Sequence, residues 1–117
     1  MDTRGASTHW VSLGERAWYV ETIWRAAADL PAQDVRVADI REVDEDCWFH
    51  GGPATVRAVV EHARSILDAD VSRPVILAAD GQVLDGMHRI AKAILDGRET
   101  VRAQRLLEDP VPDWLVE

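Results

Sequence analysis

Cysteine, tyrosine and phenylalanine each occur only once in this sequence, and methionine occurs twice. The single cysteine, Cys47, cannot form a disulfide within the chain, which excludes the disulfide-rich class of small secreted domains. No apolar run approaches the length of about 18 residues that a membrane-spanning helix needs, and no signal peptide is recognisable. We therefore expect a cytoplasmic protein with no membrane partner.

Positive charge is also scarce. The 13 lysines and arginines are outnumbered by 21 aspartates and glutamates, which gives a net charge of −8. Because general nucleic-acid binders present basic faces, we do not expect nucleic acid as a partner, although one small basic pocket for an anion fits this balance. The length of 117 residues and the hydrophobic fraction of 47% fit a single domain with one modest core.

The pattern of helices and strands predicts an α+β fold with a small mixed sheet. Ser12 and Glu15 have the spacing of a capping box, and apolar residues then recur at helical intervals, so we expect a helix over Leu13–Leu30. Alternation predicts a strand over Val35–Ile40, and an acidic loop, "REVDEDCWFHGG" at residues 41–52, follows it. The clearest helical stripe of apolar residues covers positions 53–70.

The second half of the chain predicts a hairpin, a helix and a closing strand. Two short apolar strands flank the Asp80-Gly81 turn signal. Apolar residues from Met87 to Leu95 share one helix face, Gly97 is the expected C′ residue of that helix, and "ETVRAQRLL" is the last strand. The expected parts of this one domain, 1–117, are an N-terminal helical extension over 1–33, a core over 35–107 and a tail over 108–117.

The stretch "VLDGMHRIAKAILDG", Val83–Gly97, contains the main candidate site. Gly86 at the junction of strand and helix lets the backbone approach a ligand closely. The first amides of a helix lack acceptors within it, and the helix dipole adds positive potential there, so this end suits an anion. Arg89 can add a bidentate fork to phosphate oxygens and His88 a further donor. Asp85 can cap the helix, accept a proton or hold a cation.

The segment "PVILAADGQVLDGMHRIAKAILDGRETVRAQRL" resembles the ParB/sulfiredoxin superfamily, whose hallmark is a Pro-led strand, a turn, a strand, a Gly-x-His/Arg-Arg helix start and a final strand. The match spans about Val35 to Leu107 and is closest to the Asp-Gly-His-His-Arg branch, which includes ADP-dependent free serine kinases. The resemblance implies a ParB/sulfiredoxin-like small mixed sheet with packed helices, preceded here by the N-terminal helix. It also implies that a nucleotide, either ATP, ADP or CTP, is bound through its phosphates by Gly86, Met87, His88 and Arg89.

The resemblance further implies roles for acidic residues. Asp85 matches an aspartate that faces the substrate side of the cleft in the serine kinase branch. The acidic loop lies where the catalytic glutamate of those kinases should be, and Asp44 is the nearest match by spacing, with Glu42 and Glu45 as alternatives. Met87 stands where sulfiredoxins have their catalytic cysteine, so we do not expect sulfiredoxin activity, since a thioether is no thiolate nucleophile.

Three further groups of residues are candidates for binding. Thr55 and Arg57, at the start of the second helix, either touch the ligand or belong to a solvated face. Asp44 and Asp46 either hold Mg²⁺ against bound phosphates or lie in a solvated loop. Tryptophans on or beside the first helix form a candidate surface for a protein partner. These tryptophans are Trp10, Trp18 and Trp24.

Three classes of function remain open. The first is a small-molecule kinase or other phosphoryl-transfer enzyme that acts on a hydroxyl such as that of serine, with a residue of the acidic loop as the base. The second is a non-catalytic regulatory module, in which nucleotide binding orders the Trp-bearing helix for a protein partner. The third is a ParB-like nuclease or DNA-partition factor, and the acidic net charge counts against it.

Overall fold

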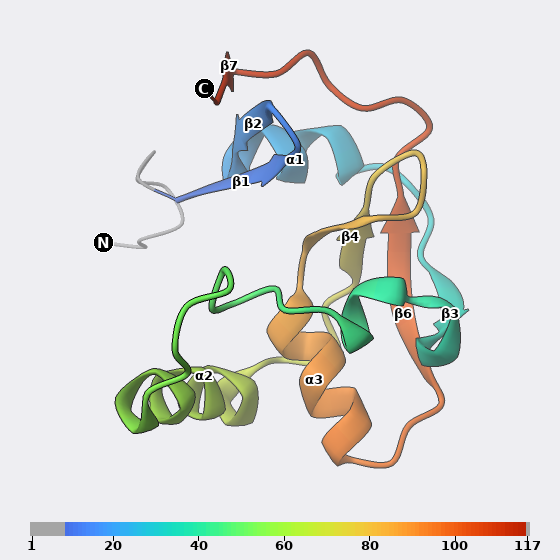
Figure 1. Ribbon diagram of the computed structural model, residues 1–117. Helices are drawn as coiled ribbons and strands as arrows, with labels where there is room; N and C mark the ends of the chain where they lie inside the picture. The colour runs from blue at the N-terminus through green and yellow to red at the C-terminus, as the bar shows by residue number, and fades with distance from the viewer. Residues whose placement is uncertain (1–8, 117) are drawn as a thin grey trace.

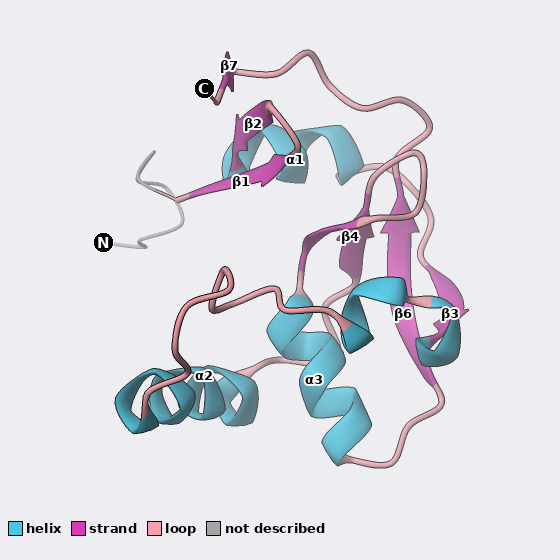
Figure 2. Ribbon diagram, viewed as in Figure 1, coloured by secondary structure: helices cyan, strands magenta, loops and turns pink. Residues whose placement is uncertain are grey.

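Within residues 9–116, which the computed structural model describes, the chain forms two small β-sheets and three α-helices, so the expected α+β class is confirmed (Figures 1 and 2). One sheet is antiparallel, in the order β1-β2-β7, and the other is mixed, in the order β3-β6-β4-β5, with β4 and β6 parallel. The strands are β1 (Trp10–Leu13), β2 (Arg16–Tyr19), β3 (Gln33–Arg36), β4 (Val75–Leu77), β5 (Val83–Asp85), β6 (Thr100–Arg105) and β7 (Trp114–Leu115). The α-helices are α1 (Val20–Ala27), α2 (Val56–Asp68) and α3 (Met87–Leu95), and two 3₁₀ turns are η2 (Val37–Asp39) and η3 (Arg41–Asp44).

The N-terminal segment corrects the expected helix over Leu13–Leu30. Residues 10–19 form a hairpin, in which Gly14 turns the chain at a φ of +59°, and α1 begins only at Val20. The prediction was wrong because the apolar spacing fits a helix locally, whereas the pairing of β2 with both β1 and β7 places Trp18 fully inside the core. The N-terminal extension is therefore a hairpin followed by a short helix.

The expected strand over Val35–Ile40 is also shorter than predicted. It begins at Gln33 and ends at Arg36, after which η2 and η3 turn the chain away from the sheet. Val37 still bonds through its amide to the carbonyl of Glu99, but the amide of Ile40 already bonds back to the carbonyl of Val37. This three-residue spacing is that of a 3₁₀ turn. Ile40 is therefore buried as part of such a turn and does not belong to the strand.

Strand β4 is the centre of the core because it is buried on both faces. Ile76 packs with the cluster that includes Trp18 and Ile23, next to α1. Its neighbours Val75 and Leu77 pack on the other face, with Ile90 of α3. The alternation explains why a short, wholly apolar strand sits in the interior of this sheet. The hairpin of β4 and β5, the helix α3 and the strand β6 confirm the expected second half.

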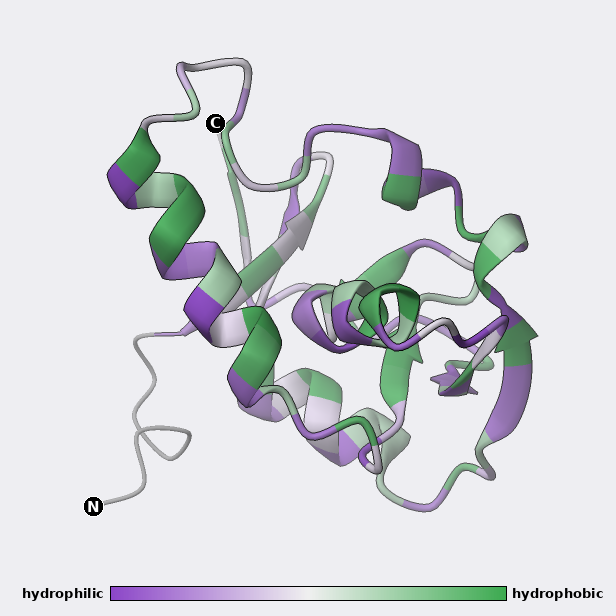
Figure 3. Cartoon of the chain, turned by 90° about the horizontal axis from the view of Figure 1, so that it is seen from below, coloured by the Kyte–Doolittle hydropathy of each residue, from purple (hydrophilic) through white to green (hydrophobic). Residues whose placement is uncertain are grey.

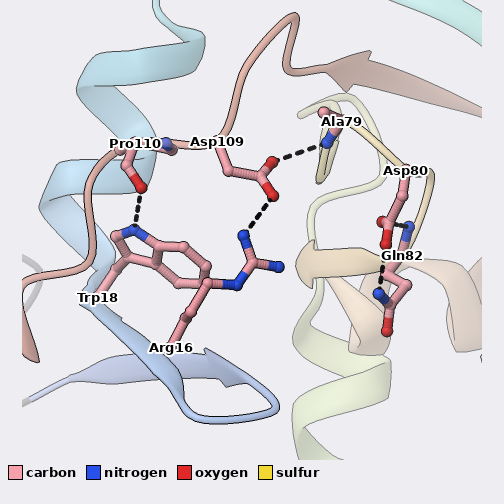
Figure 4. Close-up of polar contacts among 7 residues, drawn as sticks. All are labelled: Arg16, Trp18, Ala79, Asp80, Gln82, Asp109 and Pro110. Carbon is pink, nitrogen blue, oxygen red and sulfur yellow. Dashed lines mark hydrogen bonds and ion pairs between the residues drawn. The ribbon is translucent and has the colours of Figure 1, made fainter. Parts of the chain in front are cut away.

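The C-terminal tail crosses the molecule and pairs as β7 with β2 (Figure 1). Asp109 fixes its start, since its carboxylate accepts hydrogen bonds from Arg16 at 2.9 Å and from the amide of Ala79 at 2.8 Å (Figure 4). The indole of Trp18 donates to the carbonyl of Pro110 at 2.9 Å, as Figure 4 also shows. The tail therefore joins the two sheets. None of the helices in residues 9–116 has the length and apolar character to cross a bilayer.

Candidate functional site

Gly86 joins β5 to α3 in a backbone conformation that residues with a side chain rarely adopt. Its φ is +115°, and a Cβ built on it would lie 2.6 Å from Cγ1 of Val75 in β4. The junction therefore presses directly against the central strand. The carbonyl of Gly86 accepts the amide of Ile90 at 3.0 Å, so α3 starts immediately after the glycine. The amides of that first turn have no acceptor within the helix, which suits this end to an anion.

Asp85 and Arg89 form a partly buried network around this junction. Oδ2 of Asp85 accepts hydrogen bonds from Nε1 of Trp24 at 2.9 Å and from Arg89 at 3.1 Å. The guanidinium of Arg89 also donates to the carbonyls of Pro74 and Arg73. Asp85 makes no capping hydrogen bond to α3, and its carboxylate serves α1 and Arg89 instead. Arg89 therefore has a structural role, whatever it binds.

A pair of histidines lies beside the same junction. Nδ1 of His62 in α2 is 2.9 Å from Nε2 of His88 in the first turn of α3. The indole of Trp48 stacks on both rings, at centroid distances of 4.5 Å to His62 and 4.8 Å to His88. Burial lowers the pKa of His88 below its ordinary value, and the nearby His62 lowers it further. The first turn of α3 thus carries the His88 imidazole, whose surroundings favour its neutral form, between α2 and the acidic loop.

Both carboxylate oxygens of Asp46 accept hydrogen bonds from amides of the acidic loop. Its Oδ1 accepts the amides of Trp48 and Phe49, at 3.2 and 2.8 Å, and its Oδ2 accepts the amide of Gly51 at 2.8 Å. These bonds, the one from Gly51 foremost, lower the pKa of the Asp46 carboxyl. Since both oxygens already serve amides that position Trp48, this carboxylate fits a magnesium ion poorly. No group of three or more His, Cys, Asp or Glu side chains that could hold a metal occurs in residues 9–116.

The other acidic candidates differ in where they lie. Oε2 of Glu42 accepts the amide of Val83 at 2.6 Å, which fastens the acidic loop to the start of β5. Glu45 forms an exposed ion pair with Arg41 at 3.1 Å. Asp44 is exposed at the end of η3. Of the three, Glu42 is held against the strand that leads into Gly86.

Two cavities share residues 85–88 in their walls. One, of about 430 Å³, lies between β1, β5 and the acidic loop, and Glu42 and Trp48 form part of its wall. The other, of about 240 Å³, is lined by Arg73 and Arg89 together with the end of α2. The structure thus brings Glu42 and Asp85 together with the expected binding turn.

Thr55 and Arg57 lie elsewhere. The hydroxyl of Thr55 accepts the amide of Ala58 at 3.1 Å and so caps α2. Arg57 is exposed on the same helix. Neither residue lines the two cavities at the Gly86 junction, and neither does Asp44.

Sequence patterns did not assign His62 or Trp48 to the site. His62 lies 26 positions before His88, and only the packing of α2 against α3 joins them. The apolar stripe of α2 favoured burial of residues such as Val56 and Leu67, which are exposed, whereas the face that meets α3 carries His62. The stacking of Trp48 likewise depends on the turn that the hydrogen bonds of Asp46 stabilise. A run of acidic residues in the sequence does not predict that turn.

Comparison of the chain with protein-family models, with curated proteins and with solved structures finds no match. Any function of the chain must therefore be inferred from the geometry and chemistry of this site.

Proposed function

We propose that this chain is a ParB/sulfiredoxin-like domain that binds a nucleotide through its phosphates at residues 86–89. The order of elements supports this, because it is the order that the resemblance implies: a Pro-led strand, a turn, a second strand, a Gly-led helix and a last strand. The observation that carries the proposal is the left-handed Gly86, which lines two cavities where a Cβ would clash with Val75. The first amides of α3 have no acceptor within the helix, so a ligand in these cavities can accept hydrogen bonds from them.

Arg73 supplies a cation for the phosphates. The guanidinium of Arg89 is 13% exposed and already bonded to Asp85 and two carbonyls, so it offers few donors to a ligand. Arg73 lines the same cavity, is exposed, and makes no side-chain hydrogen bond or ion pair with the described part of the chain. A phosphate seated on the first turn of α3 would therefore meet Arg73 from the segment before β4.

The adjoining cavity offers room for the rest of the ligand and for a substrate. Residues 85–88 line both cavities, so a nucleotide whose phosphates lie at the helix start has the larger cavity beside it. In a kinase reaction, a substrate hydroxyl such as that of serine attacks the terminal phosphorus. The bond to the shortened nucleotide breaks, and the hydroxyl proton passes to a carboxylate. Glu42 is the acidic-loop residue in the wall of that cavity, so it replaces Asp44 as the first candidate base.

A non-catalytic nucleotide-binding module is the second candidate. It is favoured by the structural duties of the acidic residues, since Glu42 bonds to Val83, and Asp46 bonds to three loop amides. In that function, Trp24 would transmit ligand binding to α1, because it touches the site through Asp85. The partner surface is smaller than the sequence implied, because Trp18 is fully buried on β2.

Calorimetric titration with ATP, ADP, CTP and GTP, each with and without Mg²⁺, tests the proposal. We expect one of them to bind, and Arg73→Ala to weaken it by about tenfold or more, as the loss of a charge-assisted hydrogen bond does. Arg36→Ala is the matched control, since Arg36 is an exposed arginine of β3 outside both cavities. No heat with any nucleotide, or an equal loss in both variants, would overturn the proposal. Turnover with serine separates the kinase from the binding module.

A further inference from the structure

The helix α2 presents an apolar face that no described residue covers. None of its 13 residues is buried. Val56 is 81% exposed, Leu67 65%, and Val59 and Val60 are each close to half exposed. At 100° per residue, Val56, Val60, Ala63 and Leu67 fall within one narrow arc of the helix surface. Isolated exposed valines need no explanation, but a continuous stripe on one helix indicates a docking surface.

The body of the molecule uses the other side of α2. The helix packs against α3, through the bond between His62 and His88. Lys92 of α3 donates to the carbonyls of Leu67 and Ala69 and fixes the C-terminal end of the helix. The half-buried residues Ala58, His62, Ile66 and Ala69 mark this inner side. In Figure 1, α2 lies at the edge of the molecule, and Figure 3 shows it at the left with apolar segments in green along its coil.

Charged residues along one flank of the stripe identify what covers it. Arg57, Glu61, Arg64 and Asp68 follow one another at intervals of four, three and four residues and form one line with alternating sign. All four are exposed, and none makes an ion pair within residues 9–116. The intervals between these charges are the same from either end of the helix, and the order of signs from one end is the opposite of that from the other. That is the symmetry that an antiparallel pair of identical helices requires.

We infer that two copies of this chain associate through antiparallel packing of their α2 helices. With the two-fold axis between His62 and Ala63, Arg57 faces Asp68 of the partner subunit, and Glu61 faces Arg64 of the partner subunit. Each pair occurs twice by symmetry, and no like charges meet. A parallel pair would instead bring the charged flank against the inner side of the partner helix, where α3 lies. Charge complementarity therefore selects a second copy, in the antiparallel direction.

The dimer is a weak one. A 13-residue helix is about 20 Å long, so one pair of helices covers less than a standard protein interface. We expect a monomer–dimer equilibrium in the micromolar range that needs no nucleotide.

Charge-swap variants test the pairing directly by sedimentation velocity over a range of concentrations. Glu61→Arg places arginine opposite Arg64 of the partner subunit, and Arg64→Glu places glutamate opposite the partner's Glu61. Each variant alone should raise the dissociation constant by about tenfold, because two ion pairs become two repulsions. Both positions are exposed, so circular dichroism should show an unchanged fold. An equimolar mixture of the two variants should form a heterodimer, since every pair across the interface is then attractive.

The double variant Glu61→Arg/Arg64→Glu should likewise recover the wild-type dissociation constant. Val60→Asp, which puts a carboxylate in the middle of the apolar stripe, should give a monomer. A wild-type chain that stays monomeric at millimolar concentration overturns the inference. A dimer whose dissociation constant is the same in all four variants overturns it as well, because the contact then lies elsewhere or involves a different face.

Discussion

The carboxylate of Asp85 lies 3.1 Å from the guanidinium of Arg89, one helical turn further along the chain. Both side chains are mostly buried, and each continues into other elements. Asp85 also accepts the indole hydrogen of Trp24 in α1, while Arg89 donates to carbonyls just before β4. The Asp-Gly-Met-His-Arg motif is thus a structural joint between α1, β4, β5 and α3, in addition to a candidate binding turn.

Asp85→Ala should therefore lower the free energy of unfolding by about 2 kcal/mol or more. The substitution leaves the guanidinium of Arg89 without its carboxylate and the indole of Trp24 without that acceptor. Urea unfolding followed by circular dichroism measures the loss. Asp34→Ala is the control, because Asp34 forms an ion pair with Arg102 in which both side chains are more than half exposed. Equal losses in the two variants would contradict a structural role for Asp85.

Gly86→Ala should also destabilise the fold, by about 2–4 kcal/mol. The added Cβ meets Val75 of β4, and a φ of +115° is strained for any residue with a side chain. Gly97→Ala at the other end of α3 separates these two causes. Its φ of +75° is also positive, but its Cβ would meet nothing within 4 Å, so we expect a loss of only about 1 kcal/mol. If both variants lose the same amount, the contact with Val75 is not what requires glycine.

The sequence was sufficient to predict the second half of the chain because its signals there are local. The Asp80-Gly81 turn, the apolar run of β4 and the glycines at the ends of α3 each specify their own conformation. The first half depends on distant partners. The strand β2 pairs with β1 through the nearby turn at Gly14, but it also pairs with β7, almost a hundred residues later, and no local pattern carries that second pairing.

The candidate site was predictable to a similar extent. The turn at Gly86 and the nearby Asp85 follow from the motif, and the structure places both at the two cavities. Spacing along the acidic loop favoured Asp44, but the η3 turn leaves Asp44 exposed and anchors Glu42 to β5. Arg73 was not predicted as a site residue, because nothing in the sequence around it distinguishes it from an ordinary surface arginine.

Stability should fall as the pH drops through the titration of His88. Burial and His62 hold the folded-state pKa of His88 below its ordinary value of about 6.5, so the unfolded chain binds more protons between the two values. The contribution of this group to stability is thus fully present above about pH 6.5 and is lost below it. Protonated His88 carries a hydrogen on each ring nitrogen, so its Nε2 can no longer accept a hydrogen bond from Nδ1 of His62.

Urea unfolding at a series of pH values measures this effect. His88→Gln should flatten the dependence of stability on pH in that window, since an amide can occupy the place of the imidazole without titrating. His9→Gln, at an exposed histidine, should leave the dependence as in the wild type. A His88→Gln variant with an unchanged slope would show that the histidine pair contributes nothing to it.

Glu42→Gln decides between the two proposed functions. The amide oxygen of glutamine can still accept the Val83 amide, so we expect the free energy of unfolding to stay within about 1 kcal/mol of the wild type. The substitution removes the carboxylate that could take the hydroxyl proton. If the chain is a kinase that uses Glu42, turnover should fall by about 10²–10⁴-fold while nucleotide affinity stays within a few-fold.

Asp44→Asn, at an exposed position outside both cavities, should leave turnover unchanged. A loss in Asp44→Asn with none in Glu42→Gln would return the role of the base to Asp44, and nucleotide binding without turnover in the wild type would leave the binding module.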